Sequence, residues 1–196
     1  MKILKLEPEN FEKIIKKIVK FLRQGKITVL PTDTVYGLIC DATNQKTIER
    51  LFRIKKRKFQ KPIPIFINDI KTAKKLALID KKQGKFLKKV WPGKITAILK
   101  KRKGKKIYGV EEETIGLRVP NYELINNLLK KINCPLSGTS ANISGKPASI
   151  KIKEIINQFK NQKRQPDLII DAGNLPKSRP SKVIDLSGKK IRILRR

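Results

Sequence analysis

The sequence predicts one α/β domain over residues 1–196, built on a twisted mixed sheet with flanking helices. Its 196 residues suit a single domain, and a hydrophobic fraction of 39% supplies the apolar side chains of a packed core. Helical and strand patterns alternate along the chain, without a repeat period or a long Ser/Gly/Pro linker. The sheet is predicted to be mixed because a loop, and not a helix, separates the strands expected at 95–99 and 114–119.

Turn and cap residues delimit the elements of the first ninety residues. Gly25 ends an apolar stripe at helical spacing, and Pro31 stops the short β-branched run before it. Asn44 or Thr43 is expected to cap a second helix. The predicted elements are helices over 9–23, from the cap at Asn44 or Thr43 through Ile48, Leu51, Phe52 and Ile54, over 69–78 and over 80–90, with strands over 27–30 and 62–67.

The second half continues the alternation of helices and strands. A basic, Gly-containing loop from Lys100 to Lys106 is expected to be exposed, and Cys134–Ser137 leads into a segment rich in Ser, Gly and Asn. The predicted elements are strands over 95–99, 114–119, 168–170, 183–186 and 191–194, and helices over 121–132 and 149–159.

A formal net charge of +32, from 48 Lys plus Arg against 16 Asp plus Glu, favours anionic partners such as nucleotides and nucleic acid. Lys outnumbers Arg by 37 to 11, and Ile and Asn are abundant, so a solvated lysine-rich surface without a dedicated partner explains the charge equally well. Composition does not separate the two interpretations. The positions of a few cations beside Ser, Thr and Gly can do so.

The composition also excludes several site types. With no His in the chain, His-ligated metal sites, Ser-His-Asp or Cys-His nucleophiles and a His general base are ruled out. Cys40 and Cys134 lack a metal-binding spacing, and we expect both to be small buried thiols. The sequence has no apolar run of membrane-spanning length and no signal-peptide pattern at its start, so a soluble, cytoplasmic protein is expected.

Four segments place polar groups at the ends of predicted strands. The first, at 30–38, brings two hydroxyls and a carboxylate out of a buried strand, and the alternative is a capped turn. In the second, Lys55 and Arg57 point to one side of an extended segment and suit a polyphosphate; the alternative is a solvated charge run.

In the third segment, Arg118 interrupts an apolar strand, which requires either a ligand cavity or an ion pair with a core carboxylate. The fourth, at 137–148, is rich in small donors and suits an anion, or is a flexible surface loop. Neither a P-loop nor a G-x-G-x-x-G turn is present.

Taken in order, these segments resemble the YrdC/TsaC family of threonylcarbamoyl-AMP synthases. The resemblance covers nearly the whole chain and rests on Pro31-Thr32-Asp33-Thr34-Val35-Tyr36-Gly37-Leu38, Lys55-x-Arg57, Lys61-Pro62, Trp91-Pro92-Gly93 with Thr96, Gly116-x-Arg118-Val119-Pro120, Thr139-Ser140-Ala141-Asn142-x-Ser144-Gly145, Asp171-Ala172-Gly173 and Ser181-x-Val183-Ile184-Asp185. It implies an α/β fold around a concave basic cavity, shared with a riboflavin-pathway synthase, in the short form of the family. The chain departs from the family pattern at Lys58, Lys94-Ile95 and Lys182, which are flanking positions.

The resemblance also implies a reaction and its residues. L-Threonine, bicarbonate and ATP would give threonylcarbamoyl-AMP and pyrophosphate, and a partner transferase complex would use the product to modify adenosine in tRNA. Mg²⁺ would accompany ATP, with no metal site of the protein's own. The implied residues are the catalytic signature Lys55, Arg57, Ser140 and Asn142, then Thr32, Arg118 and Ser181 near threonine or carbamate, and Lys55, Phe59, Thr114, Asn142, Ser149 and Arg195 near ATP.

Attack of a carbamate oxygen on the α-phosphate needs positioning and charge neutralisation, which a site without His can supply. We expect Lys55 and Arg57 to hold the triphosphate, Arg118 the threonine carboxylate or carbamate, and Ser140 with Asn142 the α-phosphate. The base for the threonine amine is left open among Asp33, Lys61 and solvent.

Two other functions compete with this one. A non-catalytic RNA-binding factor fits the charge, although 11 aromatic residues are few for a base-stacking platform. The riboflavin-pathway lyase chemistry needs a His, which this sequence lacks.

Overall fold

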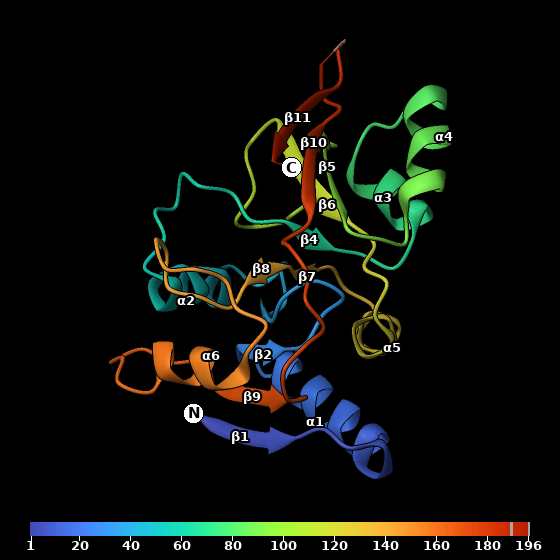
Figure 1. Ribbon diagram of the computed structural model, residues 1–196. Helices are drawn as coiled ribbons and strands as arrows, with labels where there is room; N and C mark the ends of the chain where they lie inside the picture. Colours follow the sequence, from blue (N-terminus) through green and yellow to red (C-terminus); the bar gives the residue numbers. More distant parts are fainter. Residues whose placement is uncertain (189, 196) are drawn as a thin grey trace.

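The structure, a computed structural model, describes residues 1–188 and 190–195 and confirms the α/β class (Figure 1). The helices are the short 3₁₀ helix η1 (Pro8–Asn10), α1 (Phe11–Arg23), α2 (Gln45–Lys55), α3 (Ile70–Leu76), α4 (Lys81–Val90), α5 (Glu123–Ile132) and α6 (Ile152–Phe159). The strands are β1 (Lys2–Lys5), β2 (Thr28–Leu30), β3 (Gly37–Ile39), β4 (Ile65–Phe66), β5 (Ile95–Lys100), β6 (Thr114–Arg118), β7 (Leu136–Ser137), β8 (Thr139–Ser140), β9 (Leu168–Asp171), β10 (Lys182–Asp185) and β11 (Arg192–Arg195).

The strands divide between two mixed sheets. Five strands form one sheet in the order β1-β9-β2-β3-β8, in which β1, β9 and β2 run parallel. Six strands form the other in the order β11-β10-β5-β6-β4-β7, and its β5 and β6 are antiparallel, as the connecting loop predicts. In Figure 1 the first sheet lies with α1 and α6 in the lower part of the molecule, and the second lies above it beside α3 and α4.

The chain passes from the second sheet to the first at a single residue, Gly138, between β7 and β8. A Cβ atom at this position would lie 2.3 Å from the ring of Phe66, so glycine is required for the close approach of the backbone to that ring. This crossing places the ends of strands from both sheets next to each other, and the candidate site lies there.

Short polar side chains cap α2, α3 and α4, and the cap of α2 was predicted. Asn44, and not Thr43, accepts a hydrogen bond from the Thr47 N–H at the start of α2. Asp69 and Asp80 cap α3 and α4 in the same way. The apolar face of α1 packs on α5 and on Leu30, Ile39, Leu168 and Ile170 of the first sheet. Within the described residues, no helix combines the length and the hydropathy needed to cross a bilayer.

The structure corrects several predicted boundaries. The strand expected over 62–67 contains only Ile65 and Phe66, because two prolines in the segment have no N–H to donate to a neighbouring strand. The helices expected over 149–159 and 121–132 begin at Ile152 and Glu123. Strands β1, β3, β7 and β8 were not predicted. Of the two thiols, Cys40 is buried as expected, whereas Cys134 is only partly buried.

Candidate functional site

A cavity of about 220 Å³ lies between the two sheets at the Gly138 crossing. The first sheet contributes β8 and the turn that joins β2 to β3. The second contributes the ends of β4, β6 and β11 and the two residues before β10. Its lining includes Thr32, Thr34, Tyr36, Arg57, Phe66, Arg118, Gly138, Ser140, Pro180, Ser181 and Arg195.

A second cavity of about 330 Å³ adjoins the first, at the carboxyl end of α2. The two share Arg57 and Ser140, and the second is also lined by Lys55, Lys56, Lys58, Lys61, Asn142, Ser144 and Gly145. Together the linings contain seven cationic side chains and no carboxylate. Two joined cavities lined by several cations and by no carboxylate favour a ligand with several negative charges.

Arg118 pairs with Asp33 behind the first cavity. Their side chains are 3% and 7% exposed, and Arg118 Nη2 lies 2.7 Å from Asp33 Oδ1. The guanidinium also donates from Nε to Gly93 O and from Nη1 to Thr34 Oγ1. Two of its five N–H donors therefore have no partner among the described residues. Both interpretations of Arg118 from the sequence hold, because it forms a core ion pair and also lines a cavity.

Arg57 is the cation that faces both cavities. Its Nε donates to Lys61 O and its Nη2 to Pro62 O, so main-chain oxygens orient the guanidinium without neutralising it. Three N–H donors have no acceptor in the described part of the chain. Such a group can bind phosphate oxygens in a bidentate manner.

Lys55 is buried, and its hydrogen bonds stabilise the loop that follows β8. Its Nζ donates to Ser140 O at 2.6 Å, to Asn142 O at 3.0 Å and to Asn142 Oδ1 at 2.6 Å. Ser140 Oγ donates to the same Asn142 oxygen, which joins three of the four signature residues in one network. The extended segment inferred from the spacing of Lys55 and Arg57 is wrong: Lys55 is the last residue of α2, and Lys56 is left-handed with φ of 50°.

Burial, with a smaller contribution from the charge of Arg57, lowers the pKa of Lys55 to about 7, while the three accepting oxygens favour the charged amine. The folded chain releases this proton near pH 7 and the unfolded chain near 10.5, so the free energy of unfolding should rise with pH across that window.

We expect the stability difference between the unmodified protein and Lys55→Met to grow with pH in urea denaturation. Lys58→Met, which removes an exposed lysine, controls for the change in net charge. If the free energies of unfolding of the unmodified protein and of Lys55→Met changed with pH in parallel, the lowered pKa of Lys55 would be contradicted.

Ser181 and Arg195 contact each other in the lining of the first cavity. Arg195 donates from Nε and Nη2 to Ser181 O, and Ser181 Oγ lies 2.9 Å from Thr96 Oγ1. Burial lowers the pKa of Arg118, and Arg195 is close enough to lower it further. Two guanidinium groups thus approach one cavity beside a single carboxylate, an arrangement that a bound anion would stabilise.

The turn after β2 is held by its own hydroxyls. Thr32 Oγ1 donates to Val35 O and accepts from the Thr34 N–H. Tyr36 crosses to the turn after β9, where its hydroxyl donates to Gly173 O and accepts from the Ala172 N–H. The turn is therefore capped, as the alternative interpretation held, and it also lines the cavity.

Three predicted nucleotide-binding residues lie outside the linings of both cavities. Phe59 is 55% exposed and stacks on Phe52 with ring centroids 5.0 Å apart. Thr114 pairs with Lys100, at the end of β6 opposite to Arg118. Ser149 accepts from the Lys151 N–H and donates to Glu154, and so stabilises the start of α6. The other eight predicted site residues line one or both cavities.

Sequence reasoning missed several contributors to the site. Thr34 and Tyr36 belong to the segment at 30–38 that the polar pattern singled out, but their individual contacts had no signal there. Phe66, with Arg118 5.6 Å from its ring centroid, carried no signal because an aromatic in a short strand is indistinguishable from core. Chemically, the site can bind one anion at Arg118 and Arg195 and a longer one across Arg57.

Comparison with known proteins connects this site to a family. A family model named Sua5_yciO_yrdC and described as telomere recombination matches residues 20–196. The chain is 35% identical over 191 residues to a Methanocaldococcus jannaschii protein named "Putative threonylcarbamoyl-AMP synthase", which covers 97% of this chain and 89% of that protein. It is 31% identical over 169 residues to the threonylcarbamoyl-AMP synthase of Pyrococcus abyssi, which covers 85% of this chain and 49% of that protein.

A solved structure shows the same architecture. The crystal structure of P. abyssi Sua5 complexed with L-threonine superposes with a TM-score of 0.86 at 30% identity, over 99% of this chain and 56% of that one. This chain thus spans about half the length of the P. abyssi protein.

Proposed function

Because the chain belongs to the Sua5/YciO/YrdC family, we propose that it is a threonylcarbamoyl-AMP synthase. L-Threonine, bicarbonate and ATP react to threonylcarbamoyl-AMP and pyrophosphate, which makes the enzyme a nucleotidyltransferase. The observation that carries the proposal is the pair of joined cavities, with seven cationic side chains and no carboxylate in their lining. The relatives' names and the L-threonine in the P. abyssi complex support it.

The first cavity is the threonine subsite in this proposal. Its volume of about 220 Å³ is small, and the two unpartnered N–H groups of Arg118 suit a carboxylate or a carbamate. Thr32 and Ser181 supply hydroxyls to the same cavity. The amine nitrogen attacks the carbon of bicarbonate here. One C–O bond of the bicarbonate breaks, and the hydroxide leaves with an amine proton as water to give the carbamate.

The second cavity holds the triphosphate. A carbamate oxygen attacks the α-phosphorus, the bond to the β-phosphate oxygen breaks, and pyrophosphate leaves toward Arg57 and the lysines of residues 56–61. Lys55 uses its three N–H donors on loop oxygens, so it contributes positive charge and holds Ser140 and Asn142 in place. Mg²⁺ would travel with ATP, and because no carboxylate lines the cavities, phosphate oxygens and water would coordinate it.

The structure narrows the choice of a base for the threonine amine. Asp33 accepts from Arg118 with Oδ1 and from the Asn121 N–H with Oδ2, so both of its oxygens are engaged. We therefore assign Asp33 to positioning Arg118 and leave proton removal to Lys61 or solvent. The product then passes to a transferase complex that modifies tRNA.

The test is incubation with L-threonine, bicarbonate and ATP, with the adenylate read by mass spectrometry. Product that depends on all three substrates supports the proposal, and its absence refutes it. Thermal denaturation separates the enzyme from a purely RNA-binding factor: threonine with ATP should raise the melting temperature of the enzyme, whereas an RNA-binding factor should not respond to threonine.

A further inference from the structure

A basic groove lies at the far end of the β5–β6 hairpin and shares no residue with the two cavities. Six of the seven residues from 100 to 106 are Lys or Arg, and Lys74 and Lys75 of α3 complete its cationic lining. Thr114 and Lys100 pair at this end of the hairpin, whereas Arg118 lies at the other end of β6. At about 3.4 Å per residue, the groove is roughly 14 Å along the strand from the site.

The described residues neutralise only part of the charge in this groove. Its eight cations face two carboxylates, Glu112 and Glu113, and none of the eight forms an ion pair with any described residue. Repulsion among unpaired like charges destabilises the folded chain. An anionic partner that occupies the groove would relieve it.

The groove is held on an ordered backbone. Arg102 donates from Nε to Lys74 O and from its main-chain N–H to Leu76 O, at 2.8 Å in both cases. The Leu78 N–H donates to Lys100 O, and Ala77 bridges to Lys101. These bonds fix the carboxyl end of α3 against the hairpin, so the cations are presented on a defined surface.

The chemistry of the groove favours a phosphate polymer. Its volume of about 1230 Å³ is well above that of the two cavities, and its cations come from two separate elements. Leu78 is its one apolar lining residue among those described. Protein–protein interfaces have an apolar core, whereas nucleic-acid interfaces are polar and strongly cationic.

We propose that this groove, formed by residues 100–106 with Lys74 and Lys75, binds the phosphate backbone of RNA outside the reaction site. The choice of RNA among phosphate polymers rests on the proposed function, whose product serves tRNA modification. An acidic protein surface is the competing occupant, and the experiment distinguishes the two.

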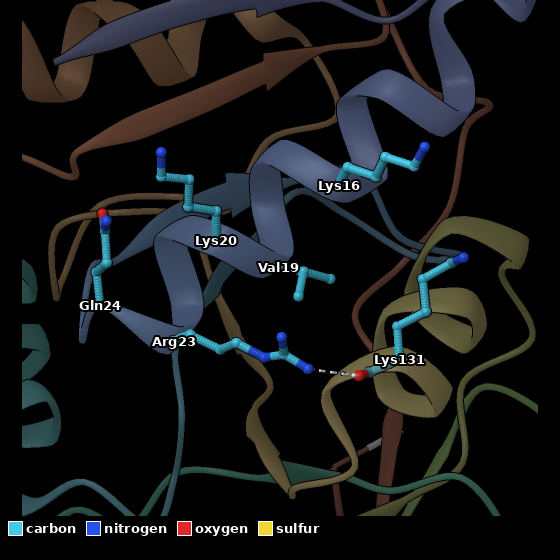
Figure 2. A pocket seen from close by; sticks show the side chains of 6 residues that line it. All are labelled: Lys16, Val19, Lys20, Arg23, Gln24 and Lys131. Atoms are coloured by element: carbon cyan, nitrogen blue, oxygen red, sulfur yellow. Dashed lines mark hydrogen bonds between the residues drawn. The ribbon is translucent and has the colours of Figure 1, made fainter.

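A separate basic pocket between α1 and α5, distinct from the two cavities of the site, supplies a matched control. Figure 2 shows Lys16, Lys20 and Arg23 of α1 and Lys131 of α5 around Val19. Here Arg23 donates to Lys131 O, and Lys131 pairs with Glu12, so part of the charge is already engaged. Replacing three lysines here changes the net charge of the protein by the same amount as replacing three in the groove.

The experiment measures binding of a fluorescently labelled RNA stem–loop by anisotropy over a salt series, without threonine or ATP. The groove variant is Lys103→Gln/Lys105→Gln/Lys106→Gln, whose side chains form no hydrogen bond within the described residues. We expect its affinity to fall at least about tenfold and the slope of log K against log salt to decrease by about two to three. The control, Lys16→Gln/Lys20→Gln/Lys131→Gln, should stay within about threefold of the unmodified protein.

Three outcomes overturn the proposal. These are an unchanged affinity of the groove variant, an equal loss in both variants, and displacement of RNA by polyglutamate as effective as by unlabelled RNA. Adenylate synthesis from the three small substrates is measured on the same variants and should be unchanged. A failure of synthesis in the unmodified protein would refute the proposed function. The anisotropy measurement would still show whether the groove binds RNA.

Discussion

Replacing Arg57 by alanine is expected to slow ATP- and threonine-dependent pyrophosphate release by about 100–1000-fold, equivalent to about 2.7–4 kcal/mol of transition-state stabilisation. Arg57 is the cation that lines both cavities, and three of its N–H donors have no acceptor among the described residues. Charge that develops on the leaving pyrophosphate would meet these donors. The side chain is half-buried and makes only main-chain contacts, so the fold should tolerate its removal.

Arg53→Ala is the matched control for this variant. It removes the same type of side chain from the last turn of α2, four residues before Arg57, but Arg53 is exposed, forms an ion pair among the described residues only with Glu49, and lines neither cavity. Its turnover should be close to that of the unmodified protein. Steady-state pyrophosphate release and urea denaturation are measured on both variants, and near-normal release from Arg57→Ala would remove Arg57 from the mechanism.

Asp33→Ala is expected to lower the free energy of unfolding by about 3–5 kcal/mol, because it leaves the buried guanidinium of Arg118 without its counter-charge. Threonine binding should also be lost, since Asp33 and Thr34 together fix the orientation of Arg118 toward the cavity. Urea denaturation gives the first quantity and calorimetry gives the second.

The double variant Asp33→Ala/Arg118→Met separates stability from binding. Replacing both members of a buried pair by apolar groups is often nearly neutral, so most of the lost stability should return. Threonine binding should not return, because the guanidinium that receives the carboxylate is gone. Threonine affinity close to that of the unmodified protein in either variant would show that the pair does not form the threonine subsite.

Most long elements could be predicted because their patterns are local. The stripe of α1, the Asn44 cap of α2 and the hairpin of β5 and β6 each depend on residues near one another in sequence. The short strands could not be predicted in this way. Strand β1 is mostly exposed on both faces and exists because it pairs with β9, which begins more than 160 residues later.

The same division holds for the candidate site. The kinds of side chain were readable from the sequence, including two cations around residue 56, an arginine in an apolar strand and a turn of small donors. The sequence did not show which of these side chains bind one another and which remain free for a ligand. That Asp33 accepts hydrogen bonds from Arg118, 85 residues away, and from Asn121 follows from contacts that no local pattern encodes.

The sequence by itself determined the α/β class and the order of its main elements, and it indicated an anionic ligand, because periodicity, caps and charge are properties of neighbouring residues. Only the tertiary structure decided that the strands form two sheets, that the cavities lie at their junction, and which cations have donors left for a ligand. The physical reason is that each N–H donor can be used once. Whether Lys55 or Arg57 keeps an N–H donor for a ligand depends on which oxygens of other segments accept hydrogen bonds from it.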